Sequence, residues 1–354
     1  MKKILSAAGY DGSSGAGVTS DAKIFSKLDI LGLSVISVLT AQNPDNIYKI
    51  AAVDDDFFDY ELKAIFDYFK IDSVKIGLIG SKKQSVILSE YIKKYKVKDV
   101  ILDPVFVSTS GVRLWDAGRD INAANANYDY TAADDANVCS NISRNVDANT
   151  ADNAADTEAV GNSRNNKSCY KGVGDFDANY LEPLLNIATV ITPNINEAEI
   201  ISGLEIKNVD CMKDAAAAIK KQYRSIKNII IKGSHLRSSE SCGITADDAV
   251  FNNEERCVTN TVQRGYCEDE EITDLLLTES NEFAVYKKRR IVTDKQIHGT
   301  GCAFSAMMAA LLTKGVNPYD ALNKTEIFVE QLINNYKIIP DNSENKKIYI
   351  TANI

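Results

Sequence analysis

The sequence contains little of what metal-centred or disulfide-bonded proteins need. Only two histidines occur in 354 residues, and the seven cysteines include no Cys-x-x-Cys pair. Structural zinc sites are built from such pairs and from histidine, and small secreted domains use even numbers of cysteines in disulfides. An odd number of scattered cysteines in a chain of this size therefore indicates free thiols in a reducing compartment.

Long apolar runs and an excess of positive charge are also missing. The apolar run at residues 30–39 carries glycine and serine and is too short to span a membrane, and the N-terminal one is interrupted at Gly9. The formal net charge is −9, whereas nucleic-acid binding needs clustered lysine and arginine. The basic run at residues 287–290 is short, and we expect it to be a solvated strand end. These absences predict a cytoplasmic protein that binds neither membranes nor nucleic acid.

Short β-branched runs alternate with amphipathic stretches along most of the chain, and 45% of the residues are hydrophobic. This alternation predicts a parallel sheet covered by helices on both faces, as one large domain; two smaller domains are the alternative. We expect strands at residues 4–8, 34–40, 74–79, 100–102, 189–192, 228–232, 274–277 and 283–286. We expect helices at residues 18–28, 57–69, 84–95, 180–186, 209–222 and 302–312, and one that starts near residue 196.

Two polar stretches interrupt this pattern. Asn, Asp and Ala dominate residues 115–176, where large aliphatic side chains nearly vanish. Such a composition cannot offset its own ordering entropy, so we expect an inserted, largely disordered loop rather than a functional binding arm. Residues 236–272 resemble a second expanded surface loop.

A glycine-rich turn precedes the apolar helix expected at residues 302–312. Gly299, Thr300 and Gly301 place consecutive backbone N–H groups at a helix N-terminus, which is a site for anions such as a transferring phosphoryl group. Cys302 follows directly, and we expect the positive helix end to lower its thiol pKa toward neutrality, so that it accepts a proton from an attacking hydroxyl. The alternative is a small buried residue that begins a core helix.

A second glycine-rich loop, residues 9–17, follows the first expected strand and leads into a helix that carries Asp21. The loop is neither a Walker A sequence nor a complete G-x-G-x-x-G, so dinucleotide binding is a minor alternative. Isolated from other motifs, this loop is weak evidence of a site.

A series of motifs, taken in order, resembles the hydroxymethylpyrimidine kinase family over nearly all of the chain outside the two polar stretches. They include an unchanged Thr-Ala-Gln-Asn segment and a Thr-Pro-Asn-x-x-Glu-Ala segment. The matching segments are residues 9–25, 40–43, 75–77, 102–105 with 110–111, 192–198, 231–235 and 293–302.

This resemblance implies a ribokinase-like, three-layer α/β/α fold with a mostly parallel sheet. It also implies ATP-dependent phosphorylation of 4-amino-5-hydroxymethyl-2-methylpyrimidine, first on its alcohol and then on the monophosphate, in thiamin synthesis. The family's pyrimidine pocket falls on Gly9, Asp21, Gln42 and Val105, where an amide and a carboxylate can orient an aminopyrimidine. A homodimer is the expected assembly.

The family's magnesium and phosphate side falls on four further residues. Asp103 and Glu197 are the expected Mg²⁺ ligands, since hard oxygen donors suit this ion. Asn194, Glu197 and Lys232 are expected at the nucleotide, with Lys232 as a point charge on the phosphates. The spacing of Asn194 and Glu197 also fits a helix capping box, and both roles are compatible.

The first glycine-rich loop departs from the family pattern at two positions. Gly12 replaces the usual proline of the first loop, and Ser14 replaces a glycine where φ is expected to be positive.

A pyridoxal kinase is the nearest rival enzyme, but its anion-hole motif usually ends in Asp where this chain has Cys302. A non-catalytic paralogue that binds the pyrimidine is the rival from another class; intact Asp103 and Lys232 favour an enzyme.

Overall fold

The computed structural model describes residues 1–43, 47–106, 178–233, 265–292 and 299–334. These residues all belong to one unit of the chain, which comprises residues 1–121 and 178–354. The loop expected at residues 115–176, most of the second loop, and the motif residues 110–111 and 293–298 lie outside the described residues.

A sheet of nine strands runs through the described part of the chain, in the order β3-β2-β1-β4-β5-β6-β7-β8-β9. The pairs from β2 through β1, β4, β5 and β6 to β7 are parallel, whereas β3 at one edge and β8 and β9 at the other are antiparallel to their neighbours. The strands are β1 (Lys3–Asp11), β2 (Leu31–Gln42), β3 (Ile47–Ala52), β4 (Ser73–Ile76), β5 (Asp99–Leu102), β6 (Val190–Ile191), β7 (Asn228–Ile231), β8 (Gly265–Leu277) and β9 (Phe283–Val292).

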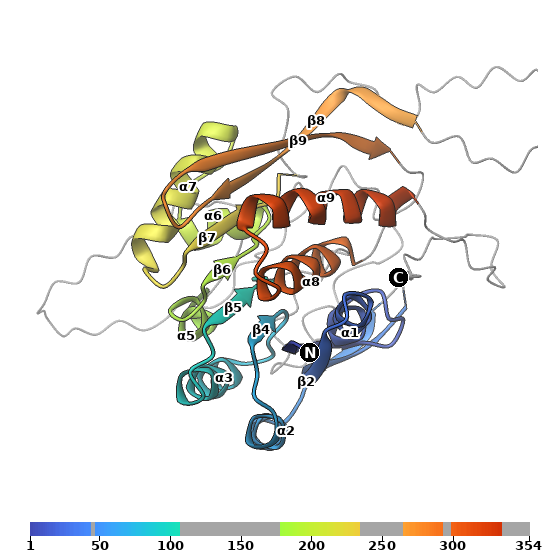
Figure 1. Ribbon diagram of the computed structural model, residues 1–354, viewed down its shortest axis with the longest axis vertical. Coiled ribbons are helices and arrows are strands. Elements are labelled where there is room, and N and C mark those ends of the chain that lie inside the picture. The colour runs from blue at the N-terminus through green and yellow to red at the C-terminus, as the bar shows by residue number, and fades with distance from the viewer. Residues whose placement is uncertain (44–46, 107–177, 234–264, 293–298, 335–354) are drawn as a thin grey trace, which may run out of the picture. The chain divides into compact units, whose positions relative to one another are not determined.

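Helices cover both faces of this sheet (Figure 1). Helices α1, α8 and α9 pack against one another on one face, and α2, α3, α5, α6 and α7 lie on the other. The helices are α1 (Gly17–Lys27), α2 (Asp55–Tyr68), α3 (Lys82–Lys94), α5 (Glu182–Leu185), α6 (Ile195–Ser202), α7 (Val209–Gln222), α8 (Thr300–Thr313) and α9 (Pro318–Asn334), with a 3₁₀ turn η1 (Ala178–Tyr180) before α5.

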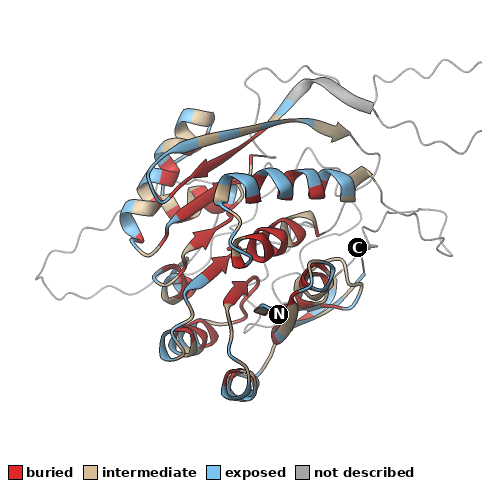
Figure 2. Ribbon diagram, in the orientation of Figure 1, coloured by how far each residue is buried: buried red, intermediate tan, exposed pale blue. Residues whose placement is uncertain are grey.

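The hydrophobic core explains why the central elements read as continuous apolar runs. All four residues of β7 are buried, as expected for a parallel strand with helices on both faces. Helix α8 is buried along almost its whole length because it lies between the sheet and the helices α1 and α9 (Figure 2). Its alanines and methionines pack with Ile24 and Phe25 of α1 and with Phe328 of α9. A helix that is apolar all round is typical of such a position.

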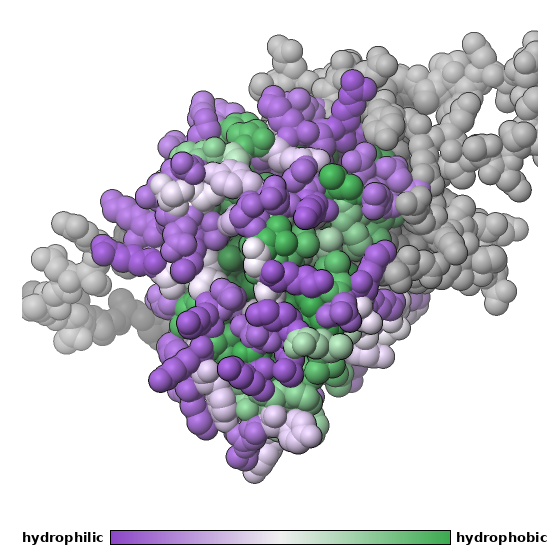
Figure 3. Space-filling model, viewed as in Figure 1, coloured by the Kyte–Doolittle hydropathy of each residue, from purple (hydrophilic) through white to green (hydrophobic). Residues whose placement is uncertain are grey.

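Polar side chains cover most of the face shown in Figure 3, with hydrophobic ones scattered between them. In the described ranges, no helix combines the length and the apolar character needed to cross a bilayer.

The structure confirms the mostly parallel sheet with helices on both faces and corrects some local predictions. The second expected loop does not extend to residue 272, because β8 already begins at Gly265 and pairs with β9 from there. The basic run at residues 287–290 lies inside β9 rather than at its end. Both errors have one cause: the charges that suggest a loop are partners across the two strands, as the ion pair between Lys287 and Glu271 shows.

Candidate active site

The carboxyl ends of the parallel strands meet at one edge of the sheet, where open α/β folds bind ligands. Gly9 lies near the end of β1, Asp103 follows β5, and Lys232 follows β7. Asn194 forms an isolated parallel bridge with Lys232, so the segments after β6 and β7 are also adjacent. Residues that are far apart in the sequence therefore lie at the same ends of the parallel strands.

The two glycine-rich loops touch each other through their backbones. Gly299 has φ 89°, and a Cβ atom at this position would lie 1.9 Å from the carbonyl oxygen of Gly15. Gly17 has φ 61°, and its Cβ would lie 2.0 Å from the carbonyl oxygen of Gly9. Only glycine fits these approaches, so residues 9–17 and 299–301 form one continuous wall.

Helix α8 starts at this wall with no side chain capping it. Its N-cap is Gly299, and no side chain accepts from the first N–H groups. The first N–H groups of a helix have no partner within the helix, and they carry the positive end of its dipole. A Cβ on Gly301 would lie 3.7 Å from the ammonium nitrogen of Lys232. The helix end and the lysine thus present positive charge to the same space.

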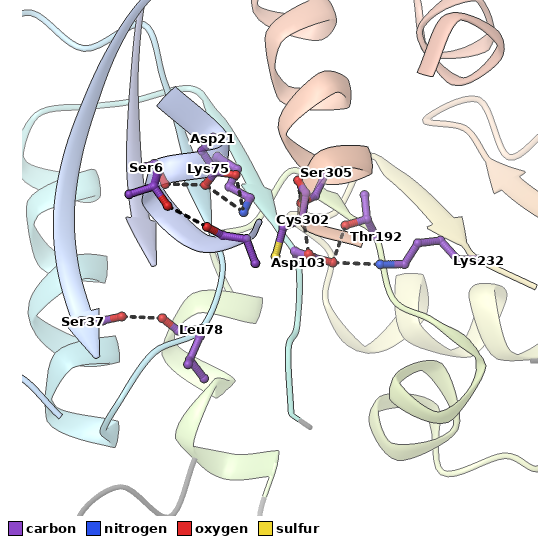
Figure 4. Close-up of polar contacts among 12 residues, drawn as sticks. Ser6, Asp21, Ser37, Lys75, Leu78, Asp103, Thr192, Lys232, Cys302 and Ser305 are labelled. Atoms are coloured by element: carbon purple, nitrogen blue, oxygen red, sulfur yellow. Dashed lines mark hydrogen bonds and ion pairs between the residues drawn. The ribbon is translucent and has the colours of Figure 1, made fainter. Parts of the chain in front are cut away.

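Asp103, which follows β5, connects the segments after β6 and β7 with helix α8. Its Oδ1 accepts hydrogen bonds from Thr192 Oγ1 and Lys232 Nζ, each at 3.0 Å, and its Oδ2 accepts from Ser305 Oγ of α8 at 3.0 Å. The residue is 1% exposed. Figure 4 shows these side chains converging on the carboxylate. Thr192 and Ser305 were not predicted as site residues. Thr192 begins the Thr-Pro-Asn-x-x-Glu-Ala motif but was given no role, and Ser305 lies inside an apolar helix without a sequence signal.

Lys232 and Glu197, beside Asp103, both have raised pKa values, but for different reasons. Burial would lower the pKa of Lys232, but the charges of Asp103 and Glu197 outweigh it and raise that pKa. Burial and the charge of Asp103 raise the pKa of Glu197 to about 8, although Lys232 acts against this. One lysine therefore balances two crowded carboxyl groups.

Glu197 also closes the capping box at the start of α6. Its Oε2 accepts a hydrogen bond from the backbone N–H of Asn194 at 2.7 Å, and Asn194 Oδ1 accepts one from the N–H of Glu197 at 2.9 Å. The predicted capping role is confirmed, and it fixes the orientation of the Glu197 side chain at the site edge.

A second buried ion pair lies on the opposite side of Cys302. Lys75 of β4 contacts both carboxylate oxygens of Asp21 at 3.0 and 3.2 Å, and Ser6 Oγ donates to the same carboxylate at 2.5 Å. Neither charged side chain is exposed, at 0% each. The carboxylate of Asp21 is thus already engaged by Lys75 and Ser6, which favours an indirect role at the pocket. Lys75 was missed as a site residue, although a lysine within an apolar strand is a usable signal.

Cys302 lies between the two carboxylate–lysine pairs (Figure 4). The expectation of a thiol pKa lowered toward neutrality is wrong for the protein without ligand. Burial raises the pKa of Cys302, and the charges of Asp103 and Asp21 add to this, while Lys75 and the N–H of Gly17 act in the opposite direction. Desolvation and the two carboxylates therefore outweigh the stabilisation of the thiolate by Lys75 and the Gly17 N–H.

Gly9, Gln42 and Val105 come together around a small apolar cluster. A Cβ on Gly9 would lie 3.2 Å from Leu78 Cδ2, and Val105 packs against the cluster that contains Leu78. Gln42, half-buried, pairs with Ile47, which packs on the same cluster. Gln42 thus pairs with a residue of the apolar cluster that lies beside Gly9 of the first glycine-rich loop.

The first loop has the conformation expected of its unusual serine. Ser14 has φ 62°, as predicted from the glycine that the family has there. Its carbonyl oxygen accepts a hydrogen bond from Lys23 Nζ at 3.2 Å. The Asp11 side chain accepts from the N–H groups of Ser13, Gly15 and Ala16. These bonds hold the strained turn in place.

A cleft of about 490 Å³ lies elsewhere, beside α7 and the turn between β8 and β9. Its lysines include Lys220, which donates to the carbonyl oxygens of Thr278 and Glu279. Cations at the end of a helix complement its dipole, which accounts for their presence. Leu277 at the end of β8 pairs with Ile229 near the start of β7. This cleft therefore lies at the amino-terminal ends of the parallel strands, whereas Lys232 lies at their carboxyl ends.

The sequence profile of the family described as phosphomethylpyrimidine kinase matches residues 11–125 and 174–344. These stretches include Asp21, Gln42, Asp103, Lys232 and Cys302. The chain belongs to the phosphomethylpyrimidine kinase family. Residues 126–173, within the Asn- and Asp-rich stretch, lie between the two matched parts.

Curated relatives of this kinase family match along most of their length. The hydroxymethylpyrimidine/phosphomethylpyrimidine kinase of Aquifex aeolicus is 26% identical over 333 residues, which are 94% of this chain and 94% of that protein. Its Bacillus subtilis namesake is 24% identical over 94% of this chain and 89% of its own length.

Solved structures share the fold. A phosphomethylpyrimidine kinase from Clostridium difficile matches with a TM-score of 0.59 at 24% identity and covers 94% of this chain and 100% of its own. An ADP complex of Bacillus subtilis pyridoxal kinase matches with a TM-score of 0.63 at 22% identity, covering 99% and 98%. The ribokinase-like fold is confirmed, and fold likeness alone does not separate the two activities.

Asp103 and Glu197 fit the chemistry of a magnesium ion. Mg²⁺ takes oxygen ligands and commonly uses one or two carboxylates together with substrate phosphates and water. The charge of Asp103 raises the pKa of Glu197, so the two carboxylates repel each other, and a cation near both relieves that repulsion. Among the described residues no group of three or more His, Cys, Asp or Glu could hold a metal, so phosphate and water would complete the ligand set.

Proposed function

We propose that this chain uses MgATP to phosphorylate 4-amino-5-hydroxymethyl-2-methylpyrimidine on its hydroxyl, and then phosphorylates the resulting monophosphate. The observation that carries this proposal is the meeting of the uncapped α8 N-terminus, Lys232 and Asp103 at one point of the sheet edge. Membership of the phosphomethylpyrimidine kinase family and the names of the curated relatives support the choice of substrate.

The phosphoryl donor side consists of positive groups that are already oriented. The backbone N–H groups of Thr300, Gly301 and Cys302 and the ammonium of Lys232 bind the phosphoryl group and stabilise its charge as it transfers. Preorganised donors of this kind supply much of the catalysis in phosphoryl transfer. Asp103 and Glu197 would hold Mg²⁺, which supplies charge neutralisation at the nucleotide phosphates. Lys232 then exchanges its Asp103 partner for phosphate oxygens.

The acceptor side places Cys302 at the hydroxyl of the pyrimidine. The hydroxyl oxygen forms the new bond to phosphorus, the bond between phosphorus and the ADP oxygen breaks, and the hydroxyl proton passes to the thiolate of Cys302. Lys75 and the Gly17 N–H favour that thiolate. Only the thiolate form accepts this proton, so the fraction of Cys302 in that form limits the rate of the step.

Gly9, Gln42 and Val105 hold the pyrimidine ring. The Gln42 amide supplies a donor and an acceptor for the aminopyrimidine edge, and Val105 supplies apolar contact. Asp21 acts through Lys75, which it pairs and orients within the buried layer behind the pocket. The protein is further proposed to act in the cytoplasm as a homodimer, which sedimentation velocity would test.

The deciding experiment incubates the purified chain with MgATP and the pyrimidine alcohol and separates mono- and diphosphate by chromatography. Pyridoxal and a Cys302→Ala variant run alongside. Diphosphate from the wild type supports the proposal. Phosphorylation of pyridoxal alone moves the substrate to vitamin B6, and pyrimidine binding without turnover supports a non-catalytic binding protein.

A further inference from the structure

A third buried charge cluster lies outside the groups assigned above, on β8, β9 and α9. Asp274 is 2% exposed and Glu326 is 1% exposed. The ammonium of Lys288 contacts Asp274 Oδ2 at 2.9 Å and also forms an ion pair with Glu326 Oε2. Two buried carboxyl groups thus share one cation.

The pKa values of the two carboxyl groups are shifted in opposite directions. Burial raises the pKa of Glu326 to about 9, and Asp274 adds to this through a hydrogen bond and its charge. Burial acts to raise the pKa of Asp274 too, but the hydrogen bond from Glu326 and the Lys288 cation lower it. Tyr286 of β9 and Glu330 of α9 are the further titratable groups close enough to interact. These shifts favour a protonated Glu326 beside a charged Asp274.

Asp274 also reaches the turn that follows Lys232. Its Oδ1 accepts a hydrogen bond from the backbone N–H of Gly233 at 2.6 Å. A Cβ on Gly233 would lie 1.8 Å from the carbonyl oxygen of Thr273, so the turn is pressed directly against β8. On its other side the N–H of Lys232 donates to the carbonyl oxygen of Pro193 at 2.8 Å.

We propose that Asp274 is a positioning residue for the nucleotide: held by Lys288 and Glu326, it fixes the Gly233 N–H and thereby the direction in which Lys232 leaves β7. The proposal rests on the proposed function, in which Lys232 binds the nucleotide phosphates. It assigns to the antiparallel strands β8 and β9 and to α9 a role in nucleotide binding, although the proposed function places none of their groups at the phosphates.

Charge balance explains why the cluster has this composition. Hydrophobic residues of similar volume usually stabilise a core at least as well as buried ion pairs. Only an acceptor at position 274 holds the Gly233 N–H, and a charged acceptor makes a stronger bond than a neutral one. Lys288 and the proton on Glu326 then allow that charge to be buried.

The test compares Asp274→Ala, Asp274→Asn and Leu276→Ala by steady-state kinetics and urea unfolding. Asp274→Ala removes the acceptor, and we expect the KM for MgATP to rise about tenfold or more, with the KM for the pyrimidine within about twofold of wild type. Asp274→Asn keeps an oxygen for the Gly233 N–H, so we expect most of the nucleotide affinity to return. Leu276 is buried on the same strand, and its truncation lowers stability without a change in either KM.

Lys232→Met separates failure of the inference from failure of the proposed function. If Lys232→Met changes neither the KM for MgATP nor kcat, the assumed role of Lys232 is wrong. If Lys232→Met weakens nucleotide use while Asp274→Ala behaves like Leu276→Ala, the positioning role is overturned. An Asp274→Asn variant as defective as Asp274→Ala overturns it too. If Asp274→Ala does not fold, the double variant Asp274→Ala/Lys288→Met, which leaves no unpaired cation, replaces it in the same assay.

Discussion

Lys232 and Asp103 form an ion pair in which burial decides the effect of a substitution. Their side chains are 15% and 2% exposed, so Lys232→Met leaves a buried carboxylate without its cation. Thr192 and Ser305 still donate to Asp103, which places the expected loss of unfolding free energy at the lower end, about 3 kcal/mol. Urea unfolding of the two proteins measures it.

The control for this prediction is Lys227→Met. Lys227 pairs with Glu279 at 3.3 Å, but their side chains are 53% and 67% exposed. Solvent screens such a pair, so we expect a change of no more than about 1 kcal/mol. Equal losses in both variants would show that burial of the Asp103 pair does not govern its stability.

Cys302 can act as a base or only as the first residue of the anion site, and the two phosphorylation steps distinguish these roles. The alcohol has a proton to lose, whereas the monophosphate attacks through an oxygen that is already ionised near neutral pH. A base is therefore needed in the first step only. We expect Cys302→Ala to reduce kcat of the first step by about 10²-fold or more and the second step much less. Single-turnover assays that start from each substrate measure the two rates, and equal losses would favour the anion-site role.

The turn before α8 depends on a glycine that a side chain cannot replace. A Cβ on Gly299 would lie 1.9 Å from the carbonyl oxygen of Gly15, so Gly299→Ala has to force the two loops apart. We expect a fall in kcat of about 10²-fold or more, because the anion site loses its geometry. Kinetics and urea unfolding of the variant test this.

Gly203 provides the matched control, since it has the same kind of backbone conformation in open space. It caps α6 with φ 71°, and an added Cβ would meet nothing within 4 Å. Gly203→Ala is expected to cost about 1 kcal/mol of stability and to leave kcat unchanged. A comparable kcat loss in both variants would mean that backbone strain, rather than contact between the loops, explains the effect.

The raised pKa of Glu326 predicts how the stability of the protein depends on pH. The pKa of Glu326 is about 9 in the folded protein against the ordinary 4.5, so the unfolded chain releases its proton first as pH rises. The stability that this group contributes is complete below about pH 4.5 and is lost progressively up to about pH 9. Glu326→Gln keeps a donor for Asp274 but does not titrate. We expect its stability relative to wild type to increase from pH 5 to pH 8, by at most roughly 1.4 kcal/mol per pH unit.

Urea unfolding of both proteins at several pH values checks this difference, in which most other titrations cancel. A difference that stays constant between pH 5 and pH 8 would show that Glu326 is ionised in the folded protein. It would also remove the proton from the cluster, while the hydrogen bond from Gly233 to Asp274 would be unaffected.

Elements with a single clear period were predictable from the sequence, whereas those stabilised by pairing were not. The bounds of α7 agree with the prediction at both ends, because its apolar residues recur at helical spacing between a capping Asn208 and a polar end. Strand β3 was missed, since it is a short edge strand whose two isoleucines, Ile47 and Ile50, do not form an apolar run, and its pairing with β2 is visible only in the fold. Helix α9 was missed as well.

The site was predictable where a motif carried it and unpredictable where only the fold assembles it. Asp103, Lys232 and Cys302 stand in motifs, and the structure brings them to one edge. Ser305 lies inside an apolar helix and carries no signal of its own. Lys75 begins the motif segment 75–77, but nothing in the local sequence reveals that it will meet Asp21. The pKa of Cys302 was mispredicted because a sequence shows a helix start but not the desolvation of the thiol or the carboxylates of Asp103 and Asp21 near it.

The chain as a whole differs from the family profile chiefly by the residues between its two matched stretches. The profile matches up to residue 125 and again from residue 174, and each candidate site residue that the structure describes lies outside residues 126–173. The strands and helices that the structure describes likewise lie outside this stretch. We therefore expect the proposed site residues to keep their positions when this stretch is removed.

This independence predicts the outcome of an internal deletion. A variant in which a short Gly/Ser linker replaces residues 126–173 is expected to keep kcat and both KM values within about threefold of wild type. Closing a shorter loop costs less entropy, by roughly 1 kcal/mol for such a change in length, so stability should rise slightly. Steady-state kinetics with both acceptors and urea unfolding measure the effects. A selective loss of the second phosphorylation would instead assign the stretch a role in binding the monophosphate, because only that acceptor carries the additional charge.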